Sequence, residues 1–129
     1  MSPQIPSHPI YRSGERWKYK APPGQEDSRL VVLGAEKDPG IGWIIHISVE
    51  SLRLPAPRHP DGVVTEIMHF PISLVSFEQA LIAEDKARFA PVVFPNEGYE
   101  TWKENQGGVW SVPVASLVQM IAGFYSDED

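Results

Sequence analysis

Two histidines and two glutamates that could do chemistry lie in two short runs rich in β-branched residues, at positions 43–50 and 63–70. His46 and Glu50 belong to the first run, and Glu66 and His69 belong to the second. Imidazole and carboxylate groups together can bind zinc or a similar divalent ion, and they can also act as general acid and base. If the two runs are neighbouring strands, His46 and Glu50 could converge with either Glu66 or His69. We therefore take these four as the candidate ligand-binding residues, with no catalytic residue and no metal ligand assigned.

A simpler interpretation is that the four side chains have no ligand. The histidines would then hydrogen-bond backbone or hydroxyl groups, and the glutamates would be solvated. The two histidines lack a compact ligand spacing, and the register of two strands cannot be read from one sequence. Isolated His and Glu residues on a sheet face are seldom ligands, so this simpler interpretation is preferred and no cofactor is expected.

The two runs are predicted to be antiparallel strands. In the first, alternation assigns Ile45, Ile47 and Val49 to a core face and the side chains of His46 and Glu50 to a wetter face. In the second, alternation separates two sets of side chains. One set is Val64, Glu66, Met68 and Phe70, and the other is Thr65, Ile67 and His69. The intervening residues 54–62 contain three prolines, which lack ladder donors, so they predict a long connection and not a strand.

The rest of the chain supplies the elements that must position these strands. Alternation predicts further strands at residues 14–21 and 28–35, followed by a loop at 36–40, and a short fifth strand at 109–112. Helical spacing begins after Ser73, Asn96 is placed to cap a helix at 97–105, and an apolar stripe at 114–124 predicts a final core helix. Residues 89–95 are predicted to be an irregular segment that covers core.

These elements predict an α+β fold: an antiparallel four- to five-stranded meander sheet with two or three helices packed on one face and the C-terminal helix in the core. The expected organisation is a flexible Pro-rich arm at residues 1–13, a single domain at 14–125 and an acidic tail at 126–129.

The composition narrows the possible partners. Eleven basic and seventeen acidic residues give a net charge of −6, which argues against a nucleic-acid binder and permits a protein partner with a basic surface. The chain has no cysteine, so neither disulfides nor thiol chemistry are expected. It shows no signal-peptide pattern and no apolar run of transmembrane length, so we expect a cytoplasmic protein with no membrane partner.

Five segments together carry a resemblance to a family. They are residues 14–19 (GERWKY), 44–49 (IIHISV), 66–73 (EIMHFPIS), 99–103 (YETWK) and 108–115 (GVWSVPVA). In this order they resemble a group of small bacterial proteins of no established activity. That group has a Gly-x-x-Trp-x-Tyr opening, an Ile-His-Ile strand, a Glu-Ile-Gly-His-x-Pro-Phe-Ser segment and a Gly-Val-Trp/Phe strand before the last helix.

The resemblance implies a bacterial source and one compact domain, and it implies no catalytic residue. Both His46 and His69 belong to the shared pattern. Met68 stands where the group has glycine, Ile72 stands where it has phenylalanine, and residues 22–26 depart from its Arg-Pro-Gly-Glu turn.

The motifs that mark the common enzyme classes are missing. There is no phosphate-binding glycine loop, no Gly-x-Ser-x-Gly, no His-Glu-x-x-His and no cysteine nucleophile. The preferred hypothesis is therefore a non-enzymatic protein-interaction module, with an immunity or inhibitor protein as one form of it. The alternative is a metal-binding domain or a small metal-assisted hydrolase that uses the strand-borne His and Glu residues.

Overall fold

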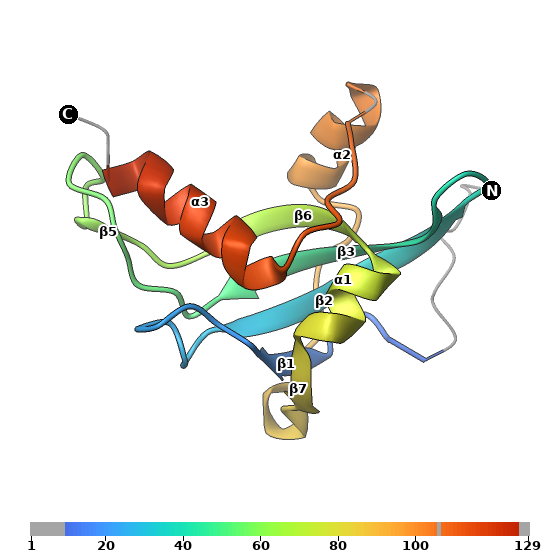
Figure 1. Ribbon diagram of the computed structural model, residues 1–129, viewed down its shortest axis with the longest axis horizontal. Helices are drawn as coiled ribbons and strands as arrows, with labels where there is room; N and C mark the ends of the chain where they lie inside the picture. Colours follow the sequence, from blue (N-terminus) through green and yellow to red (C-terminus); the bar gives the residue numbers. More distant parts are fainter. Residues whose placement is uncertain (1–9, 106, 127–129) are drawn as a thin grey trace.

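The computed structural model describes residues 10–105 and 107–126, and these residues form one antiparallel sheet with helices on both of its faces (Figure 1). The sheet has five strands in the order β6-β3-β2-β1-β7. They are β1 (Arg16–Tyr19), β2 (Arg29–Asp38), β3 (Gly42–Glu50), β6 (Ile67–Ser73) and β7 (Leu81–Glu84). Two short strands, β4 (Leu54–Pro55) and β5 (Val63–Val64), form a separate pair.

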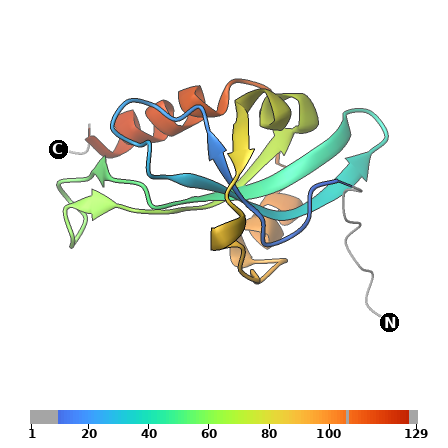
Figure 2. The same ribbon diagram turned by 90° about the horizontal axis from the view of Figure 1, so that it is seen from below.

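Three α-helices cover the sheet. They are α1 (Leu74–Ala80), α2 (Glu97–Glu104) and α3 (Val114–Ser126), and a short 3-10 helix, η1 (Lys86–Arg88), follows β7. Helices α1 and α3 lie on one face, whereas α2 lies on the other (Figure 2). The predicted α+β class, with an antiparallel sheet and a C-terminal helix packed against it, is confirmed.

The hydrophobic core lies between the sheet and the two helices α1 and α3. Ile45, Ile47 and Val49 of β3 are completely buried in it, as their alternation predicted. Phe77 of α1 and Leu117 of α3 pack into the same cluster. Each fully buried side chain of this size contributes about 1.5–3 kcal/mol, so this face carries most of the stability of the fold.

The capping residues predicted from the sequence begin two of the helices. The hydroxyl of Ser73 accepts a hydrogen bond from the amide of Ser76 at 3.2 Å, and Asn96 Oδ1 accepts from the amide of Tyr99 at 2.9 Å. Each side chain pairs a first-turn amide that has no partner within its own helix. The local signals therefore fix where α1 and α2 start.

The second run of the predicted hairpin differs from simple alternation. Ile47 pairs with Phe70 and Val49 pairs with Ile67, because the register shifts between these two pairs. Phe70 and Ile67 therefore both face the core, although they are three residues apart. The assignment of Ile67 to the side opposite Phe70 is wrong, since a bulge adds one residue to the strand. Met68, one of the two intervening residues, is exposed.

Two other local predictions also change. Leu81, expected at the end of the α1 face, begins β7, which pairs with β1 and was not predicted. Residues 109–112, expected as a fifth strand, instead form a single bridge in which Trp110 pairs with Ile72. In both cases pairing with a strand distant in sequence decides the structure, and no local pattern reports it.

The packed part of the chain begins before Gly14. Tyr11 is buried in the core, contacts the rings of Trp17 and Phe77 edge to face, and donates a hydrogen bond to Glu78 at 2.7 Å. Residues 1–9 of the expected arm and 127–129 of the expected tail lie outside the described residues. Within the described part of the chain, no helix has both the length and the apolar character needed to cross a bilayer.

Candidate functional site

The sheet face that α2 covers brings the two predicted histidines together. His46 points from β3 to this face and is 0% exposed, and His69 reaches it from the neighbouring strand β6. Nδ1 of His46 lies 2.8 Å from Nε2 of His69, and the two ring planes differ by 15°. The sequence left open whether the two imidazoles meet, and in the structure they do. His46 is buried, whereas alternation predicts a wetter face for it.

Glu36 is the carboxylate that joins the histidines, and the sequence analysis did not select it. Its Oε1 lies 2.7 Å from Nε2 of His46. The predicted loop at 36–40 is instead the end of β2, which continues to Asp38, whose Oδ1 accepts hydrogen bonds from the amides of Gly40 and Ile41. The turn at residues 38–41 is the sequence signal that could have identified Glu36. A tight turn there pairs Glu36 with Ile44, and Ile44 lies on the same face of β3 as His46.

The hydrogen bonds fix which ring nitrogens carry protons. An ionised carboxylate only accepts, so Nε2 of His46 donates to Glu36. Nδ1 of a neutral His46 then accepts from Nε2–H of His69, which leaves Nδ1 of His69 as a lone-pair acceptor. The result is a directed chain from His69 through His46 to Glu36, called the Glu–His–His chain below.

Aromatic side chains of the segment that follows β7 cover this chain. The rings of Phe94, Tyr99 and Trp102 lie 4.9–5.5 Å from the ring of His46, centroid to centroid. Tyr99 and Trp102 are on α2, where their spacing of three residues places both on the inner side of the helix. Burial of His46 therefore depends on α2 and on the irregular segment before it.

Two glycines allow this cover to approach closely. A Cβ added to Gly34 would lie 2.6 Å from the ring of Phe94, and one added to Gly98 would lie 2.7 Å from Cβ of His69. Gly34 pairs with His46 across the β2–β3 ladder. The missing side chains therefore leave the space that Phe94 and the first turn of α2 occupy.

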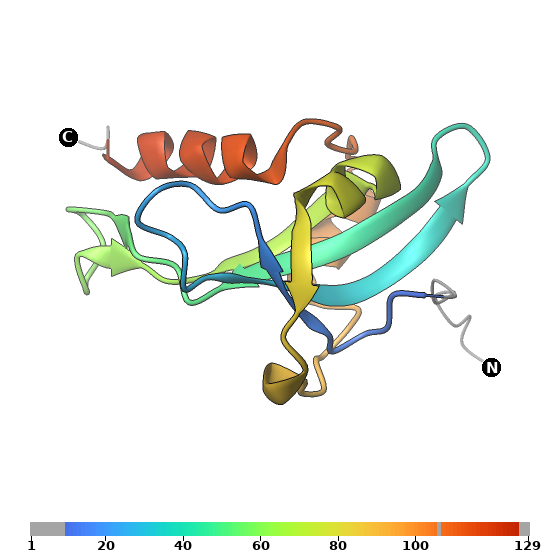
Figure 3. The ribbon, with the colours of Figure 1, turned by 60° about the horizontal axis from the view of Figure 1, so that its bottom comes forward.

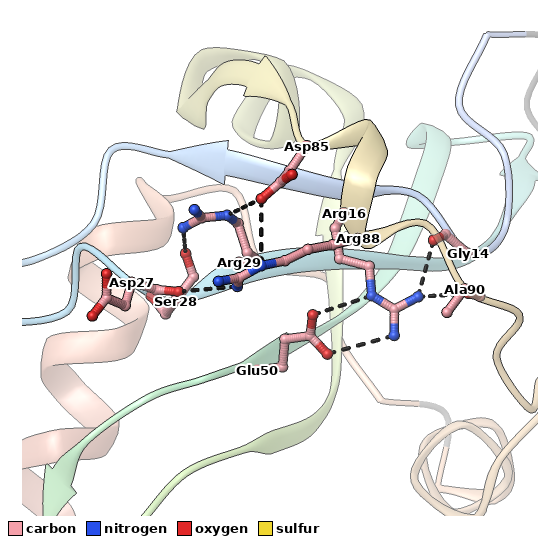
Figure 4. Close-up of polar contacts among 9 residues, drawn as sticks. All are labelled: Gly14, Arg16, Asp27, Ser28, Arg29, Glu50, Asp85, Arg88 and Ala90. Carbon is pink, nitrogen blue, oxygen red and sulfur yellow. Dashed lines mark hydrogen bonds and ion pairs between the residues drawn. The ribbon is translucent and has the colours of Figure 1, made fainter.

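The other two predicted site residues lie elsewhere. Glu50 pairs with Arg16, whose Nε is 3.1 Å from Glu50 Oε1 (Figure 4). Nη1 of Arg16 also donates to the carbonyls of Gly14 and Ala90, at 3.0 and 2.6 Å. Glu66 is exposed just before β6. Glu50 thus helps to hold the segment near Ala90 against β1 and does not contact the histidines.

A second ion pair, on the same face of the sheet, anchors the start of the segment that follows β7. Arg29 Nε lies 2.9 Å from Asp85 Oδ2, and Arg88 lies 3.5 Å from the same oxygen (Figure 4). The hydrogen bond from Arg29 lowers the pKa of Asp85 below its usual value. Residues 85–90 are therefore tied to the sheet by two arginines, which sets the path of the chain toward Phe94 and α2.

Burial lowers the pKa of both histidines. For His46, burial outweighs the opposing attraction of Glu36, so its pKa falls below the ordinary value of 6.5. For His69, burial and then the neighbouring His46 lower the pKa to about 4. Both rings are therefore neutral at neutral pH, which agrees with the proton positions deduced from the hydrogen bonds.

These pKa values predict that acid destabilises the fold. The unfolded chain binds protons on these histidines below about pH 6.5, whereas folded His69 remains neutral down to about pH 4. Lowering the pH through this window therefore favours the unfolded state. We expect the free energy of unfolding to fall by about 1–2 kcal/mol, less than the full shift implies because His69 is only half-buried. Urea denaturation between pH 6.5 and 5 measures this slope, which should be smaller in His69→Gln. A flat profile for the wild-type protein would contradict the prediction.

The Glu–His–His chain is not arranged as a metal site. Both ring nitrogens of His46 already have protein partners. Two imidazole nitrogens on one zinc ion would stand roughly 3.3 Å apart, so an ion could bind only after the 2.8 Å bond between the histidines had opened. Within residues 10–105 and 107–126, no group of three or more His, Cys, Asp or Glu side chains could hold a metal ion. The geometry gives no support to the metal-binding alternative.

A groove opens beside this chain at its Glu36 end. It has a volume of about 340 Å³ and lies between the tip of the β2–β3 hairpin, which projects from the rest of the sheet (Figure 3), and the end of α2. Glu36 and Asp38 line one wall, and Trp102 and Lys103 line the other. Lys103 Nζ is 3.5 Å from Glu36 Oε2 and 3.3 Å from the hydroxyl of Tyr99.

The face around the Glu–His–His chain can therefore bind through its surface, while His46 at the centre of the chain is enclosed. Comparison of the sequence with protein-family models and with curated proteins, and of the structure with solved structures, found no match.

Proposed function

We propose that this chain is a non-enzymatic protein-interaction module that binds a basic protein through the outer side of α2. The observation that carries the proposal is the arrangement of carboxylates on this helix. Glu97, Glu100 and Glu104 are exposed at intervals of three and four residues, so they share one side. We call these three residues the acidic side of α2.

The inner side of α2 makes this surface rigid. Tyr99 is buried, and both Tyr99 and Trp102 pack against the ring of His46. A helix fixed in this way loses little conformational freedom when a partner binds, which lowers the entropic cost of association. The buried Glu–His–His chain is, on this proposal, a support for a binding helix and not a catalytic centre.

Exposed apolar side chains lie near the start of α2. Val93, shortly before α2, is 82% exposed, and Met68 is 52% exposed. The side chain of Asn96, at the start of α2, donates a hydrogen bond to the carbonyl of Met68, so Met68 lies beside the helix. Apolar groups next to charged ones are the usual composition of a protein interface.

The charge of the whole chain favours the same kind of partner. A net charge of −6 attracts a basic protein at long range and raises the rate of encounter. Inhibition of a basic enzyme or toxin, as an immunity or inhibitor protein would perform it, is one form that such binding takes.

The proposal predicts salt-sensitive capture of a partner that depends on the acidic side of α2. We expect a tagged wild-type chain to retain one stoichiometric basic protein from the cells that make it at low salt. The triple variant Glu97→Gln, Glu100→Gln, Glu104→Gln should retain at least tenfold less, because three of its carboxylates are neutral. Affinity capture followed by quantitative mass spectrometry measures this ratio.

A matched triple variant controls for net charge. It removes an equal number of negative charges at positions away from α2 and should retain the partner nearly as well as the wild-type chain. Its three substitutions are Asp27→Asn, Asp61→Asn and Glu84→Gln. If both triple variants lose the partner equally, the binding surface is not α2. If the wild-type chain retains no stoichiometric protein at low salt, the proposed function is wrong.

A further inference from the structure

This inference rests on the proposed function and names the chemical group of the partner that the site takes. We infer that the groove between the β2–β3 hairpin and α2 binds an arginine side chain of the partner protein. The groove volume of about 340 Å³ is at the lower end of the range in which proteins bind small groups. Its position next to α2 makes it continuous with the surface proposed above.

The chain already places a cation of its own in this groove. The ammonium of Lys103 lies near Glu36 Oε2 and the hydroxyl of Tyr99, and it is 5.7 Å from the centre of the Tyr99 ring. The hydrogen bond with Tyr99, and then the negative charge of Glu36, raise the pKa of Lys103 above its ordinary value. A carboxylate and an aromatic face around one ammonium form a cation site.

Lys103 is held loosely enough to be replaced. Its contacts with Glu36 and Tyr99 are long, at 3.5 and 3.3 Å, and its side chain is 61% exposed. An exposed ion pair of this kind contributes little to stability, so a cation with better geometry can displace it. Lys103 would then swing into solvent on its flexible stem.

The charges of the groove favour an incoming cation once Lys103 has moved. Glu36 Oε1 is used by His46, while Oε2 faces the groove. Asp38 contributes a second carboxylate, of which one oxygen accepts the turn amides. Lys37, between them in β2, also lines the groove. Once Lys103 has moved, two carboxylates and one lysine line the groove, so its formal charge is negative and attracts a cation.

The shapes of the lining groups favour guanidinium over ammonium. Trp102 offers a flat aromatic surface against which a planar guanidinium can stack, which a compact, strongly hydrated ammonium does less well. The acceptors, Glu36 Oε2 and the oxygens of Asp38, lie on a different wall from Trp102. A guanidinium can donate from its edge to these oxygens while its face rests on the indole.

The test is a titration of the folded chain with three short peptides, acetyl-Gly-Arg-Gly-amide and its citrulline and lysine counterparts, followed by amide chemical shifts. We expect the arginine peptide to shift the amides of residues 36–41 and 102–109 and to bind at least fivefold more tightly than the other two. Lys103→Met should tighten its binding at least threefold, because the internal competitor is gone. Lys86→Met removes the same charge from η1 and should leave the affinity unchanged.

Loss of arginine binding in Asp38→Asn, with an otherwise native spectrum, is also expected. Equal binding of the three peptides, or no gain in Lys103→Met, would overturn the inference. A partner captured through α2 together with no peptide binding would leave the proposed function intact and remove the arginine site. Peptide binding in the groove without any captured partner would support the arginine site and show that the proposed function is wrong.

Discussion

Replacing His46 by alanine is expected to lower the free energy of unfolding by about 3–4 kcal/mol. The imidazole is completely buried and touches the rings of Phe94, Tyr99 and Trp102, so its removal leaves a cavity under the cover of the sheet. It also leaves Oε1 of Glu36 without its hydrogen-bond donor. Urea denaturation at pH 7.5 measures the change.

Two further variants separate these causes. The phenyl ring in His46→Phe is slightly larger than imidazole, so it leaves no cavity but removes both hydrogen bonds, and we expect a smaller loss of about 2 kcal/mol. His59 is exposed in the connection between β4 and β5, and His59→Ala should change the stability by less than about 0.5 kcal/mol. A His46→Ala protein as stable as the wild type would show that the cover over this face contributes nothing to the fold.

Replacing Gly34 by alanine is expected to destabilise the protein by about 2–3 kcal/mol, although the change adds a single methyl group. The new Cβ would lie 2.6 and 2.7 Å from two ring carbons of Phe94. That ring cannot simply rotate away, because it packs against Tyr99 at 4.8 Å and His46 at 5.5 Å. Overpacking of this kind costs about 1–3 kcal/mol, and here it also strains the path of the chain into α2.

A double-mutant cycle tests this explanation. In a Phe94→Ala background the clash is absent, so Gly34→Ala should cost less than about 0.5 kcal/mol there. Gly123 in α3 has no atom within 4 Å of an added Cβ, and Gly123→Ala should raise the stability by about 0.5–1 kcal/mol because alanine favours the helix. If Gly34→Ala costs the same in both backgrounds, contact with Phe94 is not the reason for glycine at this position.

The two faces of the sheet differ in the interactions that stabilise them. The face under α1 and α3 holds the apolar core, and loss of one of its large side chains acts through transfer and cavity terms. The face under α2 holds the ion pairs of Arg16 and Arg29 and the Glu–His–His chain. Its polar groups satisfy one another, so a single substitution there leaves a partner without its bond.

Much of the fold could be predicted because its signals are local. The alternation of Ile45, Ile47 and Val49 follows from the geometry of one strand, whatever lies beside it. The capping roles of Ser73 and Asn96 likewise depend on amides three residues away. His46 and His69 are far apart in the sequence, so their contact could be predicted only on the condition that their strands are neighbours.

What the sequence by itself determined is therefore most of the helices and strands, and the side of β3 from which His46 emerges. Only the tertiary structure decided that Glu36 completes the chain, that Glu50 pairs with Arg16, and that His46 is dry beneath α2. The physical reason is the separation along the chain of the residues that interact. Periodicity and capping act within a few residues. Strand register, the bulge between the Ile47 and Val49 pairs, and the packing of Phe94 over Gly34 depend on contacts between segments that are distant along the chain.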